Sequence, residues 1–311
     1  MLTFRSPAEV PAGFGPSAVT IGKFDGVHAG HRAVIERLRT VAEERGLEAV
    51  VVTFDRHPLS LLKPESCPEA LVSTEQKLEL LASAGIDATL ILTFDRTLSD
   101  LSPEAFVTST IVDALRARAV LVGADFRFGA GGAGDVALLK ELGREHGFEV
   151  LMVDDVTPDG ERRVSSTWIR ELLADGQVEA AAALMGSLPT VRGVVVRGQN
   201  RGRSMGIPTA NLSPELQGYV PADGVYAAWL TTNGRVYPAA VSVGNNPTFE
   251  GVPDKQVEAH VLDEDFHLYG ETVEIAFVKR VRPMEKFADA HALAAQMQED
   301  VRQIAEVLRS A

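Results

Sequence analysis

The chain has 311 residues, of which 45% are hydrophobic, and its 43 acidic and 30 basic side chains give a formal net charge of −13. This length provides a sizeable core and suits about two domains. The charge argues against general affinity for nucleic acid or an anionic membrane, because long-range repulsion opposes both. Any bound phosphate must therefore be held by local contacts.

Cysteine content and hydropathy both favour a cytoplasmic location. Cys67 is the single cysteine, so no internal disulfide can form, and one thiol suits a reducing environment. The first residues have no apolar signal core, and no stretch approaches the ~20 apolar residues that span a bilayer. We expect a cytoplasmic protein without membrane or nucleic-acid partners, and the oligomeric state stays open, homo-oligomers included.

The first half alternates short β-branched runs with helical runs. One helix is predicted at 32–44, and a further helical stretch runs from Trp168 to about Met185. This alternation predicts a doubly wound parallel α/β sheet that binds ligands beyond the carboxyl ends of its strands. The predicted strands are 17–22, 49–54, 89–94, 118–123 and 148–154.

The second half reads as an antiparallel β-barrel followed by a terminal helix. The domain boundary is expected near Gly186, which gives domains 1–186 and 187–311. The predicted strands are 191–198, 224–232, 235–244, 257–263 and 272–282. The apolar positions of the terminal helix are Phe287, Leu293, Met297, Val301, Ile304 and Leu308.

The stretch GKFDGVHAGH, residues 22–31, joins the first strand to the first helix. Glycines allow a tight turn and close approach to a ligand, and a helix N-terminus favours phosphate. His28 and His31 add side-chain donors at that place. The alternative is a tight turn with incidental histidines.

A second polar stretch, VSSTWIREL, opens a helix at residues 164–172. Its hydroxyls form an N-cap cluster, and Arg170 follows about one turn later, so hydroxyls, free N–H groups and a guanidinium converge. The alternative is an ordinary helix cap. The cluster consists of Ser165, Ser166 and Thr167.

The glycine-rich stretch 129–134 matches the G-x-G-x-x-G pattern, and Asp154 and Asp155 follow about 20 residues later. In a dinucleotide fingerprint the first glycine closes the strand, whereas here the strand ends earlier, at Gly123. We therefore expect a glycine-rich loop, with nicotinamide-dinucleotide binding as the alternative.

The barrel half contains GQNRGRSMGIPTANL, residues 198–212. Its glycines and arginines suit a loop that covers phosphates, and no P-loop motif is present. Thr209 and Asn211 face the same side of an extended chain and can share a hard Mg²⁺ ion. The alternative is a β-turn.

The first two motifs resemble the signatures of the nucleotidyltransferase superfamily. FDGVHAGH, followed by VVTFDRHP, LSPEAFV and VGADFRFG, resembles the FAD synthetase module of bacterial bifunctional riboflavin kinase/FAD synthetases. The resemblance implies that His28 and His31 are catalytic and contact the triphosphate of ATP. It also implies ATP contacts by Gly22, Phe24, Asp25, Gly30, Ser165, Ser166, Thr167 and Arg170, and flavin-side or nucleotide-side positions for His57, Asp125 and Phe126.

The barrel half is similar to the riboflavin kinase domain, through GRSMGIPTAN, GNNPTF, EAH, LYG and RVRPMEKF. The resemblance implies Glu258 as the base for the riboflavin hydroxyl, with Thr209 and Asn211 on Mg²⁺. The implied ATP contacts are Gly198, Arg201, Gly202, Arg203, Gly206, Pro208 and Asn246. The chain departs from the family pattern at Arg56, where proline is expected, at Gly132, where a basic residue is common, and at Ile207, where phenylalanine is more frequent.

The expected function is bifunctional. Residues 187–311 convert riboflavin and ATP to FMN and ADP, and residues 1–186 convert FMN and ATP to FAD and pyrophosphate. Two alternatives stay open: a nucleotidyltransferase for a non-flavin phosphate whose β domain is a regulatory flavin binder, and a non-catalytic flavin-responsive regulator.

Overall fold

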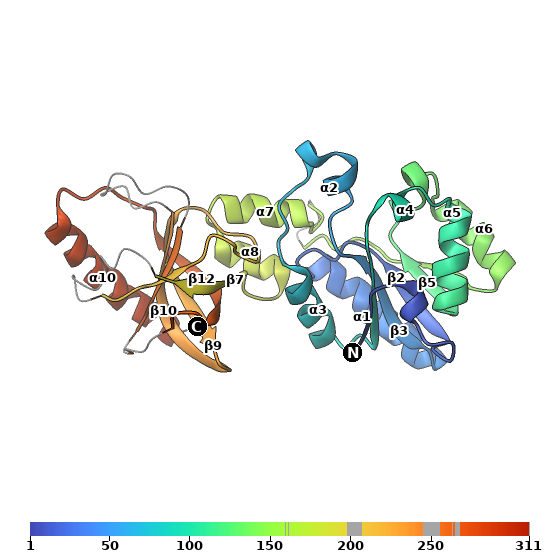
Figure 1. The fold of residues 1–311 in the computed structure, drawn as a ribbon, viewed down its shortest axis with the longest axis horizontal. Helices are drawn as coiled ribbons and strands as arrows, with labels where there is room; N and C mark the ends of the chain where they lie inside the picture. Colours follow the sequence, from blue (N-terminus) through green and yellow to red (C-terminus); the bar gives the residue numbers. More distant parts are fainter. Residues whose placement is uncertain are drawn as a thin grey trace. The chain divides into compact units, whose positions relative to one another are not determined.

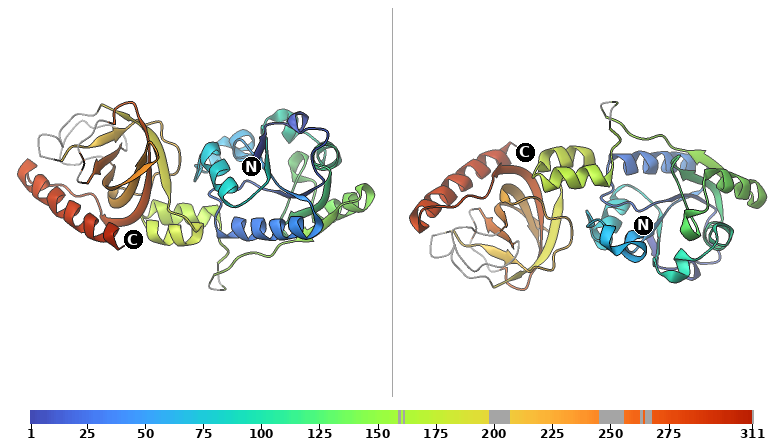
Figure 2. Two further views of the ribbon diagram at one scale, coloured as in Figure 1. Left: turned by 90° about the horizontal axis from the view of Figure 1, so that it is seen from below. Right: turned by 90° about the horizontal axis from the view of Figure 1, so that it is seen from above.

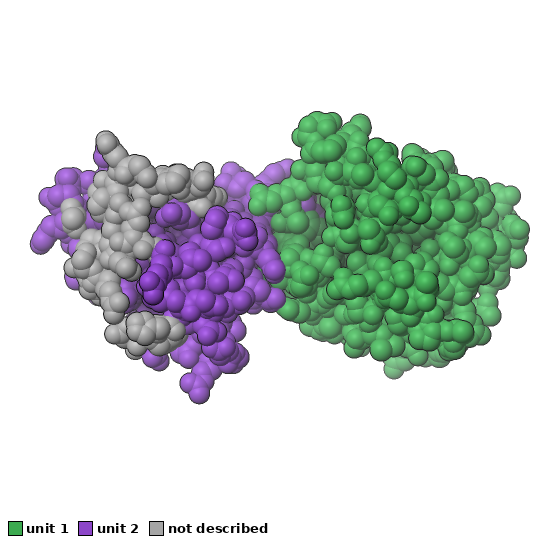
Figure 3. Space-filling model, in the orientation of Figure 1, with its two compact units in different colours: residues 1–165 green, residues 166–311 purple. Residues whose placement is uncertain are grey.

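The computed structural model describes residues 1–158, 160, 162–197, 207–244, 256–262, 264 and 268–310. Contacts divide the chain into two compact units, which Figure 3 colours separately. Unit 1 is Met1–Ser165 and unit 2 is Ser166–Ala311.

Unit 1 contains a six-stranded sheet in the order β1-β4-β3-β2-β5-β6, and every neighbouring pair is parallel. The parallel sheet predicted from the sequence is confirmed, with an additional short strand at its edge. The strands are β1 (Leu2–Phe4), β2 (Ser17–Ile21), β3 (Glu48–Phe54), β4 (Ala88–Leu92), β5 (Ala117–Val122) and β6 (Glu149–Met152).

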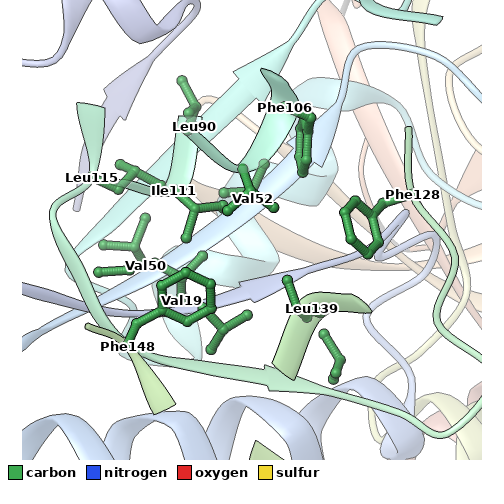
Figure 4. Close-up of a cluster of buried hydrophobic side chains, with 14 of the residues drawn as sticks. Val19, Val50, Val52, Leu90, Phe106, Ile111, Leu115, Phe128, Leu139 and Phe148 are labelled. Carbon is green, nitrogen blue, oxygen red and sulfur yellow. The ribbon is translucent and has the colours of Figure 1, made fainter. Parts of the chain in front are cut away.

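Helices cover both faces of this sheet (Figure 1). They are α1 (Ala29–Arg45), α2 (Leu59–Leu62), α3 (Thr74–Ser83), α4 (Arg96–Ser99), α5 (Pro103–Phe106) and α6 (Val136–His146), with a π-helical segment at Val107–Ala114. Leu38 of α1 and Leu81 of α3 pack on the face that carries Val51. The opposite face packs Val50 and its neighbours against α5, α6 and the π-helical segment (Figure 4).

Unit 2 is built on a closed antiparallel barrel in the order β10-β11-β8-β7-β12-β9. The predicted barrel is therefore confirmed. Two register shifts interrupt the pairing of β12 with β9, and such irregularities help a sheet to curve and close. The strands are β7 (Thr190–Val196), β8 (Ala210–Leu212), β9 (Gly224–Thr232), β10 (Arg235–Gly244), β11 (Gln256–Val261) and β12 (Thr272–Arg282).

The terminal helix α10 (Ala290–Arg309) packs on the outside of the barrel, as can be followed in Figures 1 and 2. Its N-cap Asp289 accepts a hydrogen bond from Ala292 N at 2.8 Å. Phe287, which the sequence placed on the helical stripe, lies before the helix begins. Ile304 and Leu308 of the helix are buried against Ala227 of β9.

The helical stretch predicted from Trp168 to about Met185 consists of two helices, α7 (Ser166–Ala174) and α8 (Val178–Met185). The break lies at Gly176, whose φ of +78° favours glycine. Within unit 2, α8 packs on β12, and Ala222 N donates to Leu173 O at 2.8 Å. The boundary between the two compact units therefore precedes these helices, whereas the domain boundary predicted from the sequence follows them.

Among the described residues, no helix combines the length and apolarity needed to cross a bilayer.

Candidate functional site

The connection between β2 and α1 is a turn that glycine makes possible. Gly26 has a φ of +82°, and a Cβ atom there would lie 2.9 Å from Leu71 Cδ1. Gly22 N donates to Val52 O at 3.0 Å, which ties the start of the turn to β3. The turn therefore sits at the carboxyl ends of the two central strands, where a parallel sheet binds its ligands.

Two histidines lie at the end of this turn. His28 is the N-cap residue of α1, although its ring caps no backbone N–H, and it is 5% exposed. The ring of His31 stacks on it, with centroids 3.7 Å apart. Gly30 permits this arrangement, because a Cβ atom there would lie 3.2 Å from His28 Cε1. Within the described part of the chain, neither Nδ1 atom has a hydrogen-bond partner although both are buried.

The environment keeps both rings uncharged. Burial and, to a smaller extent, the charge of Arg163 together lower the pKa of His28 to about 4. Burial also lowers the pKa of His31 well below its ordinary value, with smaller effects from His28 and Lys23. Each neutral ring offers one N–H donor and one lone pair. A buried polar atom without a partner is costly, so the pair is suited to a polar ligand.

Phe24 and Asp25 shape the turn. The Phe24 side chain is 2% exposed, and its ring centroid lies 5.0 Å from that of His31. Asp25 accepts a hydrogen bond from Leu71 N at 2.9 Å through Oδ1. Because the Phe24 ring is in the core, a ligand could meet this residue only through its backbone.

Arg163 is a polar residue of this site that the sequence reasoning did not identify. Its guanidinium forms ion pairs with Asp125 at 3.0 Å and with Asp155 at 3.1 Å. These carboxylates raise the pKa of Arg163, and all three side chains are about half exposed or more. The dibasic pair before VSST was a signal that could have identified Arg163.

The VSST stretch crosses the boundary between the units. In unit 1, Val164 O lies 3.5 Å from the position that a Cβ atom would take at Gly30, so Ser165 follows directly after a residue beside the histidine motif. Ser166 and Thr167 begin α7, and Arg170 lies one turn later, in unit 2. Their convergence on the histidines stays a prediction.

His57 and Phe126 lie on loops at the same edge of the sheet. Lys23 Nζ lies 3.4 Å from His57 Nε2, and Leu59 N donates to His57 Nδ1 at 3.1 Å. Phe126 stacks on Phe128 with centroids 5.5 Å apart.

Two of the three positions that depart from the family pattern, Arg56 and Gly132, lie in unit 1. The exposed Arg56 pairs with the neighbouring Asp55 at 3.2 Å. Gly132 has a φ of +67° and belongs to a short helical turn in the glycine-rich loop. This loop starts after Phe128, well beyond the end of β5, so it does not have the strand-to-helix geometry of a dinucleotide fingerprint.

Unit 2 has a separate cavity of about 100 Å³. It is lined by the outer face of the barrel on one side and by α10 with the segment before it on the other. Strand residues contribute polar atoms, and the helical side contributes an apolar wall. The lining includes Thr209, Ser242, Glu258, Met284, Leu293 and Met297.

Two of the predicted kinase residues, Thr209 and Glu258, line this cavity, and Asn211 is paired with one of them. Thr209 Oγ1 donates to Glu258 Oε2 at 3.2 Å, and Asn211 is the register partner of Glu258 in the β8–β11 pair. His260 fixes the neighbouring backbone, since its Nδ1–H donates to Pro208 O at 2.8 Å. Other predicted residues lie outside the described part of the chain: Gly198, Arg201, Gly202, Arg203, Gly206 and Asn246.

A buried ion pair forms part of the cavity lining. Arg282 donates to Asp300 through Nε at 2.9 Å and through Nη2 at 2.7 Å. Gln296 Nε2 donates to the same carboxylate at 2.9 Å, and the guanidinium lies over the ring of Phe287. The sequence did not indicate this pair, because Arg282 and Asp300 belong to different elements.

Family models match both halves of the chain. The FAD synthetase model matches residues 12–168, and the riboflavin kinase model matches residues 185–308.

Whole-chain relatives show the same combination. The bifunctional riboflavin kinase/FMN adenylyltransferase of Escherichia coli strain K12 is 37% identical over 283 residues, which cover 91% of this chain and 90% of the relative. The protein of that name from Listeria monocytogenes is 36% identical, with 91% and 89% covered. A crystal structure described as the macrolide-efflux protein from Streptococcus pneumoniae matches with a TM-score of 0.85 and 31% identity over 96% of each chain. The chain belongs to the family of bifunctional riboflavin kinase/FMN adenylyltransferases.

Proposed function

We propose that the chain makes FAD from riboflavin in two ATP-dependent steps. Residues 187–311 phosphorylate riboflavin to FMN with release of ADP, and residues 1–186 join FMN to the AMP portion of ATP with release of pyrophosphate. The observation that carries the proposal is the pair of separate polar sites, one in each unit, in a chain whose two halves match the two family models. The proposed compartment is the cytoplasm, since both steps consume ATP and the single Cys67 suits a reducing environment.

The adenylyl transfer needs no protein nucleophile. An oxygen of the FMN phosphate attacks the α-phosphorus of ATP, and the bond from this phosphorus to the bridging oxygen of pyrophosphate breaks. Catalysis then depends on positioning and on charge stabilisation. His28 and His31 are suited to this role, because their neutral rings donate to triphosphate oxygens without requiring a cation in a buried site.

The side chains proposed to bind phosphate at this edge of the sheet include a positively charged one. We assign Arg163 to the triphosphate or flavin phosphate, since its two exposed carboxylate partners can be exchanged for a phosphate at little cost. Ser165, Ser166, Thr167 and Arg170 complete the clamp in this proposal. Asp125 is released from Arg163 when phosphate binds and then faces the flavin side.

The kinase step transfers the γ-phosphoryl group of ATP to the 5′-hydroxyl of riboflavin. The Glu258 carboxylate takes the hydroxyl proton while the hydroxyl oxygen bonds to the γ-phosphorus and ADP leaves. Thr209 already donates to this carboxylate, which orients it at the cavity. The apolar wall from Met284 and Met297 suits the flavin ring.

The residues at this site fit a Mg²⁺ ion. Thr209, directly before β8, supplies a hydroxyl, Asn211 of β8 supplies an amide oxygen two residues later, and hard oxygens are the ligands that Mg²⁺ prefers. When bound, the ion neutralises charge on the transferred phosphoryl group.

The test supplies riboflavin, ATP and Mg²⁺ to the purified protein and follows the flavins over time by chromatography. FMN should appear first and then convert to FAD. Unchanged riboflavin would contradict the kinase assignment, and FMN without FAD would contradict the adenylyltransferase assignment.

Two variants separate the sites. His28→Ala should abolish FAD formation and leave FMN formation intact, whereas Glu258→Gln should do the reverse when FMN is supplied. His146→Ala and Glu271→Gln are matched controls outside both sites, and both should retain both activities. Loss of both activities in a folded His28→Ala protein would contradict the two-site assignment.

A further inference from the structure

Lys77 of α3 is a buried lysine next to the strand ends of unit 1. Its side chain is embedded so that the residue is 8% exposed. Its ammonium donates to Phe54 O at 2.8 Å, to Lys23 O at 3.2 Å and to Thr53 Oγ1 at 3.4 Å. An ammonium has three protons, so these three acceptors occupy all of them.

The acceptors belong to the ends of the two central strands. Phe54 is the last residue of β3, and Lys23 follows β2 at the start of the turn to α1. Thr53 Oγ1 also donates to Lys23 O, at 3.1 Å. The Lys23 carbonyl therefore receives two hydrogen bonds from buried side chains, which fixes the first peptide of the turn.

The turn needs such support because its backbone is strained. Phe24 has a φ of +50° and Val27 has a φ of +40°, in the left-handed region that bulky and β-branched residues disfavour. Strained conformations persist only where surrounding contacts impose them. On the far side of the turn, Asp25 binds Leu71 N. Phe24 is in contact with His31, so a change in the turn would move the ring stack.

Burial lowers the pKa of Lys77, while the carboxylates of Asp25 and Asp55 raise it. A buried ammonium that satisfies three acceptors and has two carboxylates near it is costly to build and has no proton left for a ligand. This arrangement is typical of a group that holds other groups in place.

We propose that Lys77 is a positioning residue for adenylyl transfer: its buried ammonium holds the Lys23 carbonyl, and through it the strained turn 23–27, in the shape that sets Phe24 against His31. The inference rests on the proposed adenylyltransferase function. It assigns Lys77 no contact with ATP or FMN.

The test is Lys77→Met, which keeps the length of the side chain and removes its three donors. With FMN and ATP supplied, the KM for ATP should rise at least about fivefold and kcat/KM should fall at least about tenfold, as expected when a turn that positions catalytic groups is misplaced. Riboflavin phosphorylation by the same molecules should stay within about twofold, because unit 2 has its own site. Lys140→Met, an exposed lysine of α6, is the matched control and should change neither reaction.

Hydrogen exchange distinguishes positioning from general stability. In Lys77→Met, peptides that cover residues 22–28 should exchange faster while peptides from β4 and α6 keep their parental rates. A uniform increase across unit 1 with an unchanged KM for ATP would overturn the proposal, as would parental kinetics in the folded variant.

A second variant covers the case in which Lys77→Met does not fold. Thr53→Val removes one acceptor of Lys77 and one donor to Lys23 O while it keeps the buried shape. It should raise the KM for ATP in the same direction by a smaller factor, and an unchanged KM would overturn the proposal. If the parental chain forms no FAD, the proposed function fails, whereas hydrogen exchange of residues 22–28 still decides whether Lys77 holds the turn.

Discussion

The imidazole rings of His28 and His31 stack with centroids 3.7 Å apart and planes inclined by 18°. Two cations at this distance in a buried site would repel strongly, and each proton taken up would also lose solvation. The stack therefore stabilises the neutral form of both rings. A triphosphate has the opposite effect, since its negative charge favours protonated imidazole.

The first prediction concerns the titration of His28. In the free protein its pKa should be about 4, and ATP should raise it, because bound phosphate favours the charged ring. Side-chain NMR of ¹⁵N-labelled histidine from pH 7.5 to about 3 measures both values, with His28→Gln used for assignment. A midpoint near 6.5 in the free protein would contradict the neutral stack.

The same shift predicts a stability that depends on pH. The folded pKa of His28 is lower than the unfolded value, so the unfolded chain binds more protons, and the free energy of unfolding of unit 1 falls as pH falls from 6.5 toward 4. The difference of about 2.5 pH units sets an upper limit of about 3 kcal/mol for this residue. Urea unfolding at pH 7 and pH 5 should show a smaller loss in His28→Phe than in the parental protein. Equal losses would mean that His28 is not responsible.

Much of the architecture was predictable because its signals are local. Buried parallel strands such as β3 and β5 are continuous β-branched runs, and the spacing of His28 and His31 places them together at one helix start. β1 was missed because three residues are too short to show a pattern, and it is stabilised by pairing with β4. The break between α7 and α8 at Gly176 was not predicted, because it depends on the left-handed backbone conformation of this residue.

Contacts between distant parts of the chain could not be predicted. The ion pair of Arg163 with Asp125 joins residues 38 positions apart in sequence, and the buried hydrogen bonds of Lys77 involve backbone carbonyls, which every residue has. The amphipathic pattern of α3 alone suggests that a lysine there is solvated. Only the fold shows that the side chain reaches the ends of β2 and β3.

Gly30→Ala should reduce FAD formation without unfolding the protein. The added Cβ would lie 3.2 Å from His28 Cε1 and 3.3 Å from Nδ1, so the ring must shift by a few tenths of an ångström. Misplacement of a catalytic group on this scale should lower kcat/KM for ATP about tenfold. Steady-state kinetics with supplied FMN measures this, and Gly13→Ala, where no atom is within 4 Å and the backbone is not left-handed, is the control for loss of a glycine in unit 1. A kinetic effect as large in the control would refute the explanation.

A lysine side chain should not perform the role of Arg163 in binding phosphate. The guanidinium presents several N–H groups that reach Asp125 and Asp155 together, whereas an ammonium acts as a point charge. We expect Arg163→Lys to raise the KM for ATP or FMN and Arg163→Met to raise it further, with FMN formation from riboflavin unchanged. Because the ion pairs are exposed, the melting temperature should change little. Parental KM values in both variants would remove Arg163 from the site.

The last prediction concerns the buried pair in unit 2. Asp300→Asn leaves the Arg282 charge uncompensated, with side-chain exposures of 14% for Arg282 and 5% for Asp300, and the free energy of unfolding of unit 2 should fall by about 3–5 kcal/mol. The pair also lines the cavity that contains Glu258, so the KM for riboflavin should rise at temperatures where the variant is folded. FAD formation from supplied FMN serves as the control because it uses unit 1. Replacing both partners by Met and Leu should recover part of the stability, since no unpaired charge is left, but not the KM for riboflavin. A double variant with a parental KM would show that the pair contributes to stability alone.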